Sequence, residues 1–363
     1  MRAALCIVLL HVWALACPEI TKADPFSPQR ALKVGVIQSL TGIAAEDGKT
    51  TLQALQLAAN ELNRDGVTRV ELLVQDDGTE AKNAVTAYKK LAASGVDAVV
   101  GPTWSFTMNS VIPLAAQDQI PIINTSTIPE CLDLKKSGGA AFSTAISVAE
   151  HARIFGEYLE QKPTTTSIII HTNNSWGEAQ RVAYRQVLNE QGITVLREIP
   201  GVNFDANDWR ASLPALKALQ PGLWVLLVNR ADLDTLIRQM RALGITAPVY
   251  ASYHFADTLR LHNHDKVYGD VCYSQTFQPT PSEVAFAAKF KAAFGSDPQA
   301  FADNTYDTLF LLYRAFERSL FKEVSLREAL MGTTYSGVVG EYRFDSQRTF
   351  SIGKGLLECV PGR

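Results

Sequence analysis

Short apolar runs rich in β-branched residues alternate with amphipathic stretches of helical period along most of this chain, and that rhythm limits the folds it can adopt. Residues 32–37 predict a strand, and residues 51–62 carry apolar side chains at helical spacing before the pattern stops at Asp65-Gly66. Strands separated by single helices pair in parallel through right-handed crossovers, so this part predicts an open α/β unit. Its further strands are expected at residues 70–74, 98–100 and 120–123, and its further helices at 82–93 and 108–116.

The same rhythm restarts after residue 147, which predicts a second α/β unit. Segment 138–147 is rich in small residues and lacks a helical period, so it is the expected first crossing between the units. After Tyr273 the pattern changes to helices and then, from Gly337, to a Gly-punctuated β-rich end. The expected strands of the second unit are 168–170, 194–199, 223–228 and 249–251, its helices are 149–159, 179–189, 209–218 and 233–242, and the later helices are 282–294, 304–320 and 326–331.

The N-terminus has the pattern of an export signal. Met1-Arg2 is a short positive start, and the apolar run 3–16 is too short for the about 20 residues of a bilayer span. Small residues at Thr21 and Ala23 favour cleavage before Asp24, so residues 1–23 are predicted to be a signal peptide and the mature protein to be periplasmic. Cleavage before Cys17 with lipid attachment is the less favoured alternative.

Composition excludes two classes of chain. With 47% hydrophobic and 20% charged residues, the 363 residues suffice for about two packed domains, which excludes a disordered chain and a collagen-like chain. The 34 Lys and Arg residues against 37 Asp and Glu residues give a net charge of -3. That balance leaves no basic surplus to neutralise phosphates, so we expect no nucleic-acid partner.

Sequence signatures of catalysis are missing. The chain holds no Gly-x-Gly-x-x-Gly after its first strand, no Gly-x-x-x-x-Gly-Lys-Ser/Thr phosphate loop and no Gly-x-Ser-x-Gly elbow. His262 and His264 have no third metal ligand nearby, and Asp76-Asp77-Gly78 is ordinary turn chemistry. We therefore expect a protein that is not an enzyme, with no catalytic residues, no cofactor and no metal.

Two loops carry the polar side chains of a candidate binding site. Residues 101–107 join the third strand to its helix, and residues 124–127 follow the fourth strand. In open parallel sheets, ligands bind beyond the carboxyl ends of the strands, where a helix N-terminus presents N–H groups to an anion. Ser105 can add its hydroxyl, so both loops could converge on one carboxylate. Simple N-capping by Ser105 and turn formation by Ser126 are the alternative at even weight.

A series of short motifs runs through the mature chain in a fixed order. They are residues 34–42, Gln75-Asp76-Asp77, Val99-Val100-Gly101-Pro102, Ile122-Ile123-Asn124, Trp176-Gly177, Ile237-Arg238-Gln239, Leu243-Gly244, Tyr306-Asp307 and Gly337-Val338-Val339-Gly340. No single motif is specific, but in this order and spacing the chain resembles the type I periplasmic binding proteins. It is most similar to the leucine/isoleucine/valine-binding group of ABC importers, from about Leu32 to about Val360.

The resemblance implies an α/β fold of two Rossmann-like lobes joined by a three-strand hinge, with the ligand held in the cleft between them. Lobe 1 would comprise residues 31–144 plus 275–352, and lobe 2 residues 146–272 plus 354–361. The hinge rotation would be absorbed near residues 143–145, 273–275 and 351–354.

The resemblance also implies a set of ligand-binding residues. It places Ser105 and Thr127 on the ligand carboxylate, and the Ser126 backbone carbonyl toward an ammonium group. Further side chains would line the cleft around this centre, and they are Trp104, Trp176, and Asn229 or Arg230.

One position departs from the amino-acid-binding relatives. The Glu that neutralises the amino group in those proteins falls at Tyr253, whose phenol supplies no negative charge at pH 7. Either Asp47 or Glu46 compensates, or the ligand is not a zwitterion. A pocket with Trp104, Trp176 and Tyr253 also suits an aromatic or amide-bearing acid, and Trp176 is expected to be exposed in the cleft rather than buried.

Taken with the export signal, the resemblance implies a solute-binding subunit of an ABC importer, acting as a monomer that delivers a small carboxylate-bearing metabolite to a membrane permease. A sensory binding protein of the same fold is the alternative. The resemblance also brings Cys272 toward the C-terminal segment, so that Cys272 and Cys359 could pair while Cys131 stays free.

Overall fold

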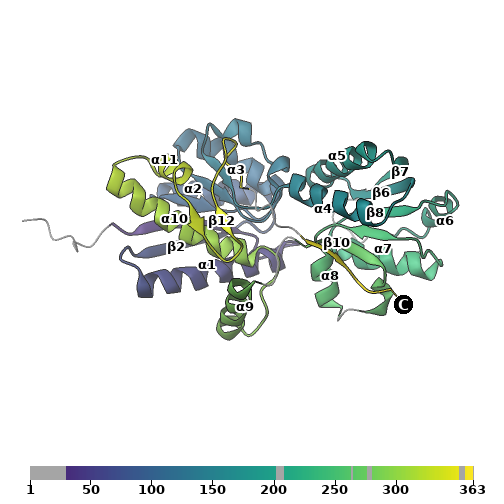
Figure 1. Ribbon diagram of the computed structural model, residues 1–363. Helices are drawn as coiled ribbons and strands as arrows, with labels where there is room; N and C mark the ends of the chain where they lie inside the picture. The colour runs from purple at the N-terminus through teal and green to yellow at the C-terminus, as the bar shows by residue number, and fades with distance from the viewer. Residues whose placement is uncertain (1–29, 202–207, 263–264, 276–279, 351–355, 363) are drawn as a thin grey trace, which may run out of the picture.

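The computed structural model describes residues 30–201, 208–262, 265–275, 280–350 and 356–362. Two α/β lobes lie side by side along the long axis of the molecule (Figure 1), which confirms the expected two-lobe α/β fold. The expected signal peptide 1–23 and the hinge segment 351–354 lie outside the described residues. None of the helices in the described part of the chain has the length and apolar character needed to cross a membrane.

The first lobe is built on a parallel sheet of five strands in the order β2-β1-β3-β4-β5. Parallel strands with helices on both faces are buried, and every residue of β1 except the partly buried Lys33 is accordingly buried. The strands are β1 (Leu32–Gln38), β2 (Val70–Asp76), β3 (Ala98–Val100), β4 (Ile122–Asn124) and β5 (Ala141–Ser143).

Helices from two distant parts of the sequence cover this sheet. Three follow the first-lobe strands directly, and three arrive only after the second lobe has been made, together with a short antiparallel pair of strands (Figure 1). These elements are α1 (Ala45–Asp65), α2 (Ala81–Ala93), α3 (Ser105–Asp118), α9 (Pro281–Phe294), α10 (Ala302–Lys322), α11 (Leu326–Met331), β11 (Tyr335–Ser336) and β12 (Glu341–Tyr342).

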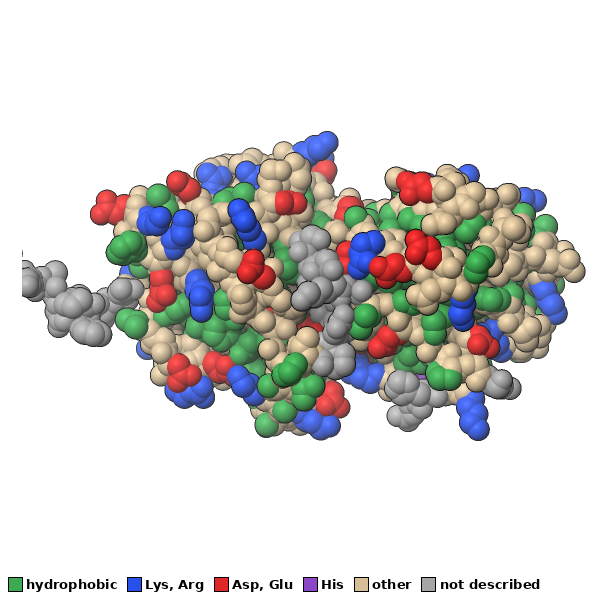
Figure 2. Space-filling view, in the orientation of Figure 1, with side chains coloured by type: hydrophobic (Ala, Val, Ile, Leu, Met, Phe, Trp, Pro, Cys, Tyr) green, Lys and Arg blue, Asp and Glu red, His purple; other side chains and the backbone are tan. Residues whose placement is uncertain are grey.

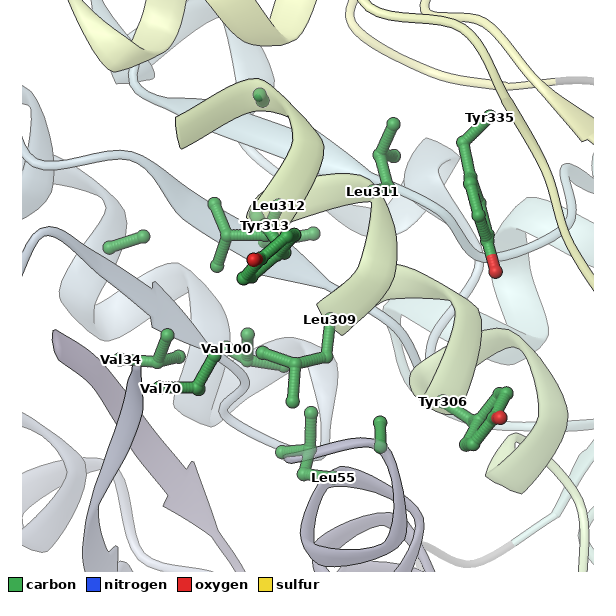
Figure 3. Close-up of a cluster of buried hydrophobic side chains, with 14 of the residues drawn as sticks. Val34, Leu55, Val70, Val100, Tyr306, Leu309, Leu311, Leu312, Tyr313 and Tyr335 are labelled. Carbon is green, nitrogen blue, oxygen red and sulfur yellow. The ribbon is translucent and has the colours of Figure 1, made fainter. Parts of the chain in front are cut away.

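The largest core cluster of the first lobe joins those two parts of the sequence. Leu309 and Tyr313 of α10 point toward Leu55 of α1 and toward Val34 and Val100 on the sheet (Figure 3). All five side chains are at most 6% exposed, and burial of one such Leu contributes about 2 kcal/mol. The first lobe is therefore complete only when α10 has packed against α1.

The second lobe has a sheet of six strands in the order β13-β10-β9-β8-β6-β7, parallel except for the antiparallel pair β10 and β13. Its strands are β6 (Thr166–Thr172), β7 (Thr194–Gly201), β8 (Leu223–Leu227), β9 (Val249–Ala251), β10 (Val271–Gln275) and β13 (Leu356–Cys359). Its helices are α4 (Val148–Gln161), α5 (Ser175–Glu190), α6 (Leu213–Lys217), α7 (Arg230–Ala242) and α8 (Phe255–Leu261).

Successive residues of the central strands bury opposite faces of this sheet. Ile168, Ile170 and Leu226 belong to one core cluster, whereas Ile169 and Val225 belong to the other. Because both faces are covered, the strands appear in the sequence as unbroken apolar runs.

A disulfide bond fastens the C-terminal strand to the second lobe. Cys272 of β10 lies opposite Cys359 of β13 in the antiparallel register, and their sulfur atoms are bonded. Cys131 is free and buried. The expected pairing is confirmed.

The helices α1, α3, α5 and α7 begin several residues earlier than the sequence pattern predicts, and one helix is much shorter. The helix expected at residues 209–218 is α6, which spans only Leu213–Lys217. Pro214 fits the first turn of a helix, and Trp209, although buried, precedes the helix with its backbone N–H donating to Gln239. The apolar spacing of residues 209–218 therefore indicates burial and not helical structure.

Candidate ligand-binding site

A cavity of about 160 Å³ lies between the lobes at the carboxyl ends of the strands. The first lobe contributes Ile43, Asp47, Trp104, Ser105, Phe106, Ser126, Thr127 and Phe301. The second lobe contributes Thr172, Asn174, Trp176, Asn229, Arg230, Tyr253 and His254. The nine residues predicted to bind the ligand are all in this set, whereas Glu46, the alternative to Asp47, is not. The structure therefore brings these nine residues together around one cavity.

The N-termini of several helices face this cavity, but they differ in their capping residues and in the charge of their first turns. α5 and α7 are capped by the side chains of Asn174 and Asn229, and each has an acidic residue in its first turn. α1 and α10 lack a side-chain cap but also have acidic residues in the first turn. α3 has neither a side-chain cap nor a first-turn acid. Among these helices, α3 therefore keeps the most of the partial positive charge that favours an anion.

Ser105 is the first residue of α3 and is not its cap, so the N-capping interpretation is wrong. The cap position belongs to Trp104, and no side-chain cap bond forms there. The Ser105 hydroxyl lies 3.3 Å from the Ser175 hydroxyl at the start of α5 in the other lobe. Gly101 lets the chain reach this position, because its φ of +91 and a Cβ only 2.0 Å from the Ile37 carbonyl oxygen would exclude a side chain.

Asn124 organises the second loop. Its Oδ1 accepts hydrogen bonds from the backbone N–H groups of Ser126 (3.3 Å) and Thr127 (3.1 Å), and its Nδ2 donates to the Thr127 carbonyl. The Ser126 hydroxyl donates to the Thr103 carbonyl and so ties this loop to the one before α3. The turn is therefore made by Asn124, and not by Ser126 as the alternative interpretation has it.

Asp47 and Arg230 bring opposite charges together across the cleft. Arg230 Nη2 of the second lobe lies 3.6 Å from Asp47 Oδ1 and 3.1 Å from Glu46 Oε2 of the first. Asp47 Oδ2 accepts a hydrogen bond of 3.1 Å from Trp104 Nε1. Burial raises the pKa of the Asp47 carboxyl, and Arg230 and the Trp104 bond oppose that rise.

Aromatic side chains form the wall on the second-lobe side. Trp176 Nε1 donates a 2.8 Å hydrogen bond to the Tyr253 hydroxyl, and the Tyr253 ring stacks on His151 at 4.4 Å between centroids. Trp176 is only 8% exposed, so the expectation that it would be exposed rather than buried is wrong: it lines the cavity from within the core. Burial raises the pKa of Tyr253 and lowers the pKa of His254 to about 3, so both are neutral at pH 7.

The sequence profile of the family described as periplasmic binding protein matches residues 31–351, nearly the whole described chain.

The chain belongs to the periplasmic binding protein family.

Curated relatives of this periplasmic binding protein support the same assignment. The Leu/Ile/Val-binding protein BraC3 of Rhizobium johnstonii is 24% identical over 315 residues, which cover 85% of this chain and 83% of BraC3. The leucine-, isoleucine-, valine-, threonine- and alanine-binding protein of Pseudomonas aeruginosa is 21% identical and covers 87% of this chain and 86% of its own. The resemblance to the leucine/isoleucine/valine-binding group is thereby confirmed.

Solved structures share the fold. A solute-binding protein of an ABC transporter from R. palustris, in complex with benzoate, has a TM-score of 0.80 at 17% identity and covers 92% of this chain and 94% of its own. LivJ of Streptococcus pneumoniae, in complex with isoleucine, has a TM-score of 0.76 at 21% identity and covers 91% of this chain and 99% of its own. These two structures hold benzoate and isoleucine, and their likeness to this periplasmic binding protein extends over nearly the whole chain.

Some lining residues of this binding protein are not predicted from its sequence. Thr172 is the last residue of β6 and Asn174 follows it, so the same rule that selected Ser105 could have found them. Thr172 Oγ1 is buried and has no hydrogen-bond partner among the described residues. Ile43, Phe106 and Phe301 carry no comparable signal. Within the described part of the chain, no group of three or more His, Cys, Asp or Glu could hold a metal ion.

Proposed function

We propose that this protein is the extracytoplasmic solute-binding subunit of an ABC importer and that it captures a small carboxylate-bearing metabolite in the cavity between its lobes. The start of α3 carries this proposal, because it combines an uncapped helix N-terminus, no first-turn acid and the Ser105 hydroxyl. These features together favour an anionic group with hydrogen-bond acceptors. Thr127 lines the cavity beside it and supplies a second hydroxyl.

The remaining lining favours a flat, apolar body behind the carboxylate. Trp104, Trp176, Tyr253 and Phe301 all line the cavity, and aromatic walls pack well against rings and branched chains. Asp47 is the one carboxylate in that lining, and its two oxygens already face Trp104 and Arg230. An α-ammonium group near Asp47 would have to compete with Arg230, so aromatic and amide acids suit this cavity better than simple zwitterions.

Binding to both lobes implies closure on the ligand. The first lobe offers Ser105 and Thr127, and the second offers Trp176 and Arg230, so the full set of contacts exists only when the lobes approach. A ligand then shifts the population toward the closed state by no more than its differential affinity for the two states.

A thermal-shift screen of the mature protein tests the proposal, with benzoate, amide acids and leucine as probes. A ligand at 100 times its dissociation constant adds about 2.7 kcal/mol to the free energy of unfolding. We expect a carboxylic acid to stabilise the protein and its matched primary amide or alcohol not to. Stabilisation by none of the acids, or equal stabilisation by the uncharged analogues, contradicts the carboxylate site.

The importer role needs a separate measurement. Ligand-loaded protein should stimulate ATP hydrolysis by its cognate permease complex in proteoliposomes, and unloaded protein should stimulate it less. If the ligand-loaded protein does not stimulate ATP hydrolysis by the permease complex but binds a membrane receptor, the result would support the sensory alternative.

A further inference from the structure

A second cavity, of about 320 Å³, lies behind the first between α8 of the second lobe and α9 and α10 of the first. We call it the rear cavity. Thr127, Tyr253 and Phe301 line both cavities and form the wall between them. Phe301 has a left-handed φ of 72, and its ring lies 6.4 Å from the rings of both Tyr253 and His254. The two spaces therefore meet at Thr127, Tyr253 and Phe301.

The charged groups of the rear cavity are mostly acidic. Asp257 of α8, Glu283 of α9 and Asp303 of α10 face one cation, Arg260. Arg260 Nη2 is already paired with Asp257 at 2.8 Å. Among the described residues, neither Glu283 nor Asp303 forms a salt bridge, so the first-lobe side of the cavity has carboxyl groups without a cation.

A buried amide oxygen adds an unpartnered acceptor on the same side. Asn304 is 2% exposed and lines the rear cavity, and its Nδ2 is fixed by the carbonyls of Thr125 (2.6 Å) and Thr144 (3.4 Å). Its Oδ1 has no hydrogen-bond partner among the described residues, nor has Oε1 of Gln299, which also lines the cavity. Buried acceptors left without a donor are unfavourable, so this cluster is matched to a group that brings several donors.

The raised pKa values of Asp303 and Glu283 agree with a site that binds a cation. Burial raises the pKa of Asp303 to about 8, and repulsion from Glu283 adds to that rise. Burial likewise raises the pKa of Glu283 to about 7. His151 also lines the cavity, but burial lowers its pKa to about 3, so it brings no positive charge. A cation between the two carboxyl groups would favour their ionised forms.

We propose that the rear cavity is a second ligand compartment, which takes an organic cation of the ammonium or guanidinium type against Asp303, Glu283 and the Asn304 amide oxygen. The inference rests on the proposed function in that both cavities hold a solute of the importer. Because they share three wall residues, a ligand with a carboxylate at one end and a cation at the other can occupy both. That arrangement also places the cation away from Asp47, where Arg230 already lies.

Isothermal titration calorimetry with three probes tests this. Agmatine carries cationic groups without a carboxylate, arginine carries both, and benzoate carries only the carboxylate. We expect at least one cationic probe to bind the wild-type protein. Asp303→Asn and Glu283→Gln should each weaken that binding about tenfold or more and leave benzoate binding unchanged. Both substitutions keep the shape of the side chain, and Glu160→Gln on the exposed surface of α4 is the matched control.

A variant that fills the rear cavity separates loss of binding from loss of fold. Ala287→Phe fills the rear cavity from α9, and it should abolish binding of the cationic probe while the melting temperature of the unliganded protein and the benzoate affinity stay within error. Arginine binding that needs both Asp303 and Ser105 supports one ligand in both cavities, and agmatine binding that ignores Ser105→Ala supports a separate occupant of the rear compartment. Absence of cation binding, or binding that ignores Asp303 and Glu283, overturns the inference. Failure of every carboxylate to bind would instead overturn the proposed function.

Discussion

The two lobes contribute to the cavity in different ways. In the first lobe, the site is held by bonds within the lobe: Asn124 fixes the Ser126–Thr127 turn, and Ser126 ties that turn to Thr103. In the second lobe, Arg230 and Ser175 reach across to first-lobe partners. The first-lobe loops are therefore organised before any closure, as is the Trp176–Tyr253 wall of the second lobe. The contacts of Arg230 and Ser175, in contrast, depend on closure.

This difference assigns the lobes separate tasks. A preorganised half-site pays no ordering cost on binding and can set the affinity for the ligand head group. The second-lobe residues that reach across the cleft, Arg230 and Ser175, make these contacts only in the closed form, so they set the balance between open and closed states. The following substitutions test that division.

The largest effects are expected in the two cores. Leu309→Ala in the first lobe and Leu226→Ala in the second remove fully buried side chains, and each should lower the free energy of unfolding of its own lobe by about 2–5 kcal/mol. Differential scanning calorimetry should show two transitions, each shifted by only one variant, while Phe321→Ala, at a position 87% exposed, shifts neither. One common transition that both variants shift equally would show that the lobes are energetically a single unit.

Head-group binding should depend on the first lobe. Ser105→Ala and Thr127→Ala each remove a hydroxyl from the cavity, and hydrogen bonds to a charged group contribute about 1.5–3 kcal/mol, or about 10- to 150-fold in affinity. Calorimetric titration with the acid found by the screen measures this, with Ser94→Ala at the end of α2 as the control. If both variants keep wild-type affinity, the carboxylate does not lie there.

Closure should depend on the second lobe. Arg230→Gln removes the cation that pairs with Glu46 and Asp47 across the cleft. Because Glu46 is largely exposed, we expect the free energy of the closed state relative to the open state to rise by about 0–1 kcal/mol. Small-angle scattering of the unliganded variant should give a larger radius of gyration than wild type, with a less than fivefold change in affinity. Arg185→Gln, which loses a pair with Glu198 inside the second lobe, is the control. An unchanged scattering curve would remove Arg230 from closure.

A further prediction concerns pH. The pKa of Asp303 is about 8 in the native state and about 3.9 in the unfolded chain, so between these values the native state holds a proton that the unfolded state has lost. This group therefore lowers stability progressively as pH rises from about 4 to about 8. Urea unfolding at pH 5 and pH 8 measures this. The free energy of unfolding of Asp303→Asn should rise relative to that of wild type at the higher pH. Parallel pH profiles would contradict the burial of this carboxyl.

The strands and the site loops were predictable because burial and turn chemistry leave local patterns. β1, β6 and β8 are apolar runs, and Ser105 and Thr127 follow strands at the edge where ligands bind. Helix starts were missed for the same physical reason that makes them functional. The first turns of α1, α3, α5 and α7 face the cavity, so they carry polar or functional side chains in place of an apolar stripe.

Other features depend on contacts between distant parts of the chain. Phe301 reaches the site only because α10 returns to the first lobe after the second has been made, and nothing in its neighbours indicates this. Trp176 was expected to be exposed because its loop is polar, but the Tyr253 hydroxyl provides a partner for its indole N–H within the core. A single sequence does not encode such pairings in any local pattern.

The bond between Cys272 and Cys359 turns part of the chain into a covalent ring. The two residues are 87 apart, and the ring they close carries α9, α10 and α11, which belong to the first lobe, while both of its ends are fixed in the second. A protease that nicks this ring once, for example near the exposed Phe321, would release no fragment until the disulfide is reduced. Thermal loss of the first lobe would likewise leave α10 on a tether anchored at both ends, so it stays close to α1 and can pack against it again. Oxidation thus makes damage to one lobe local and reversible.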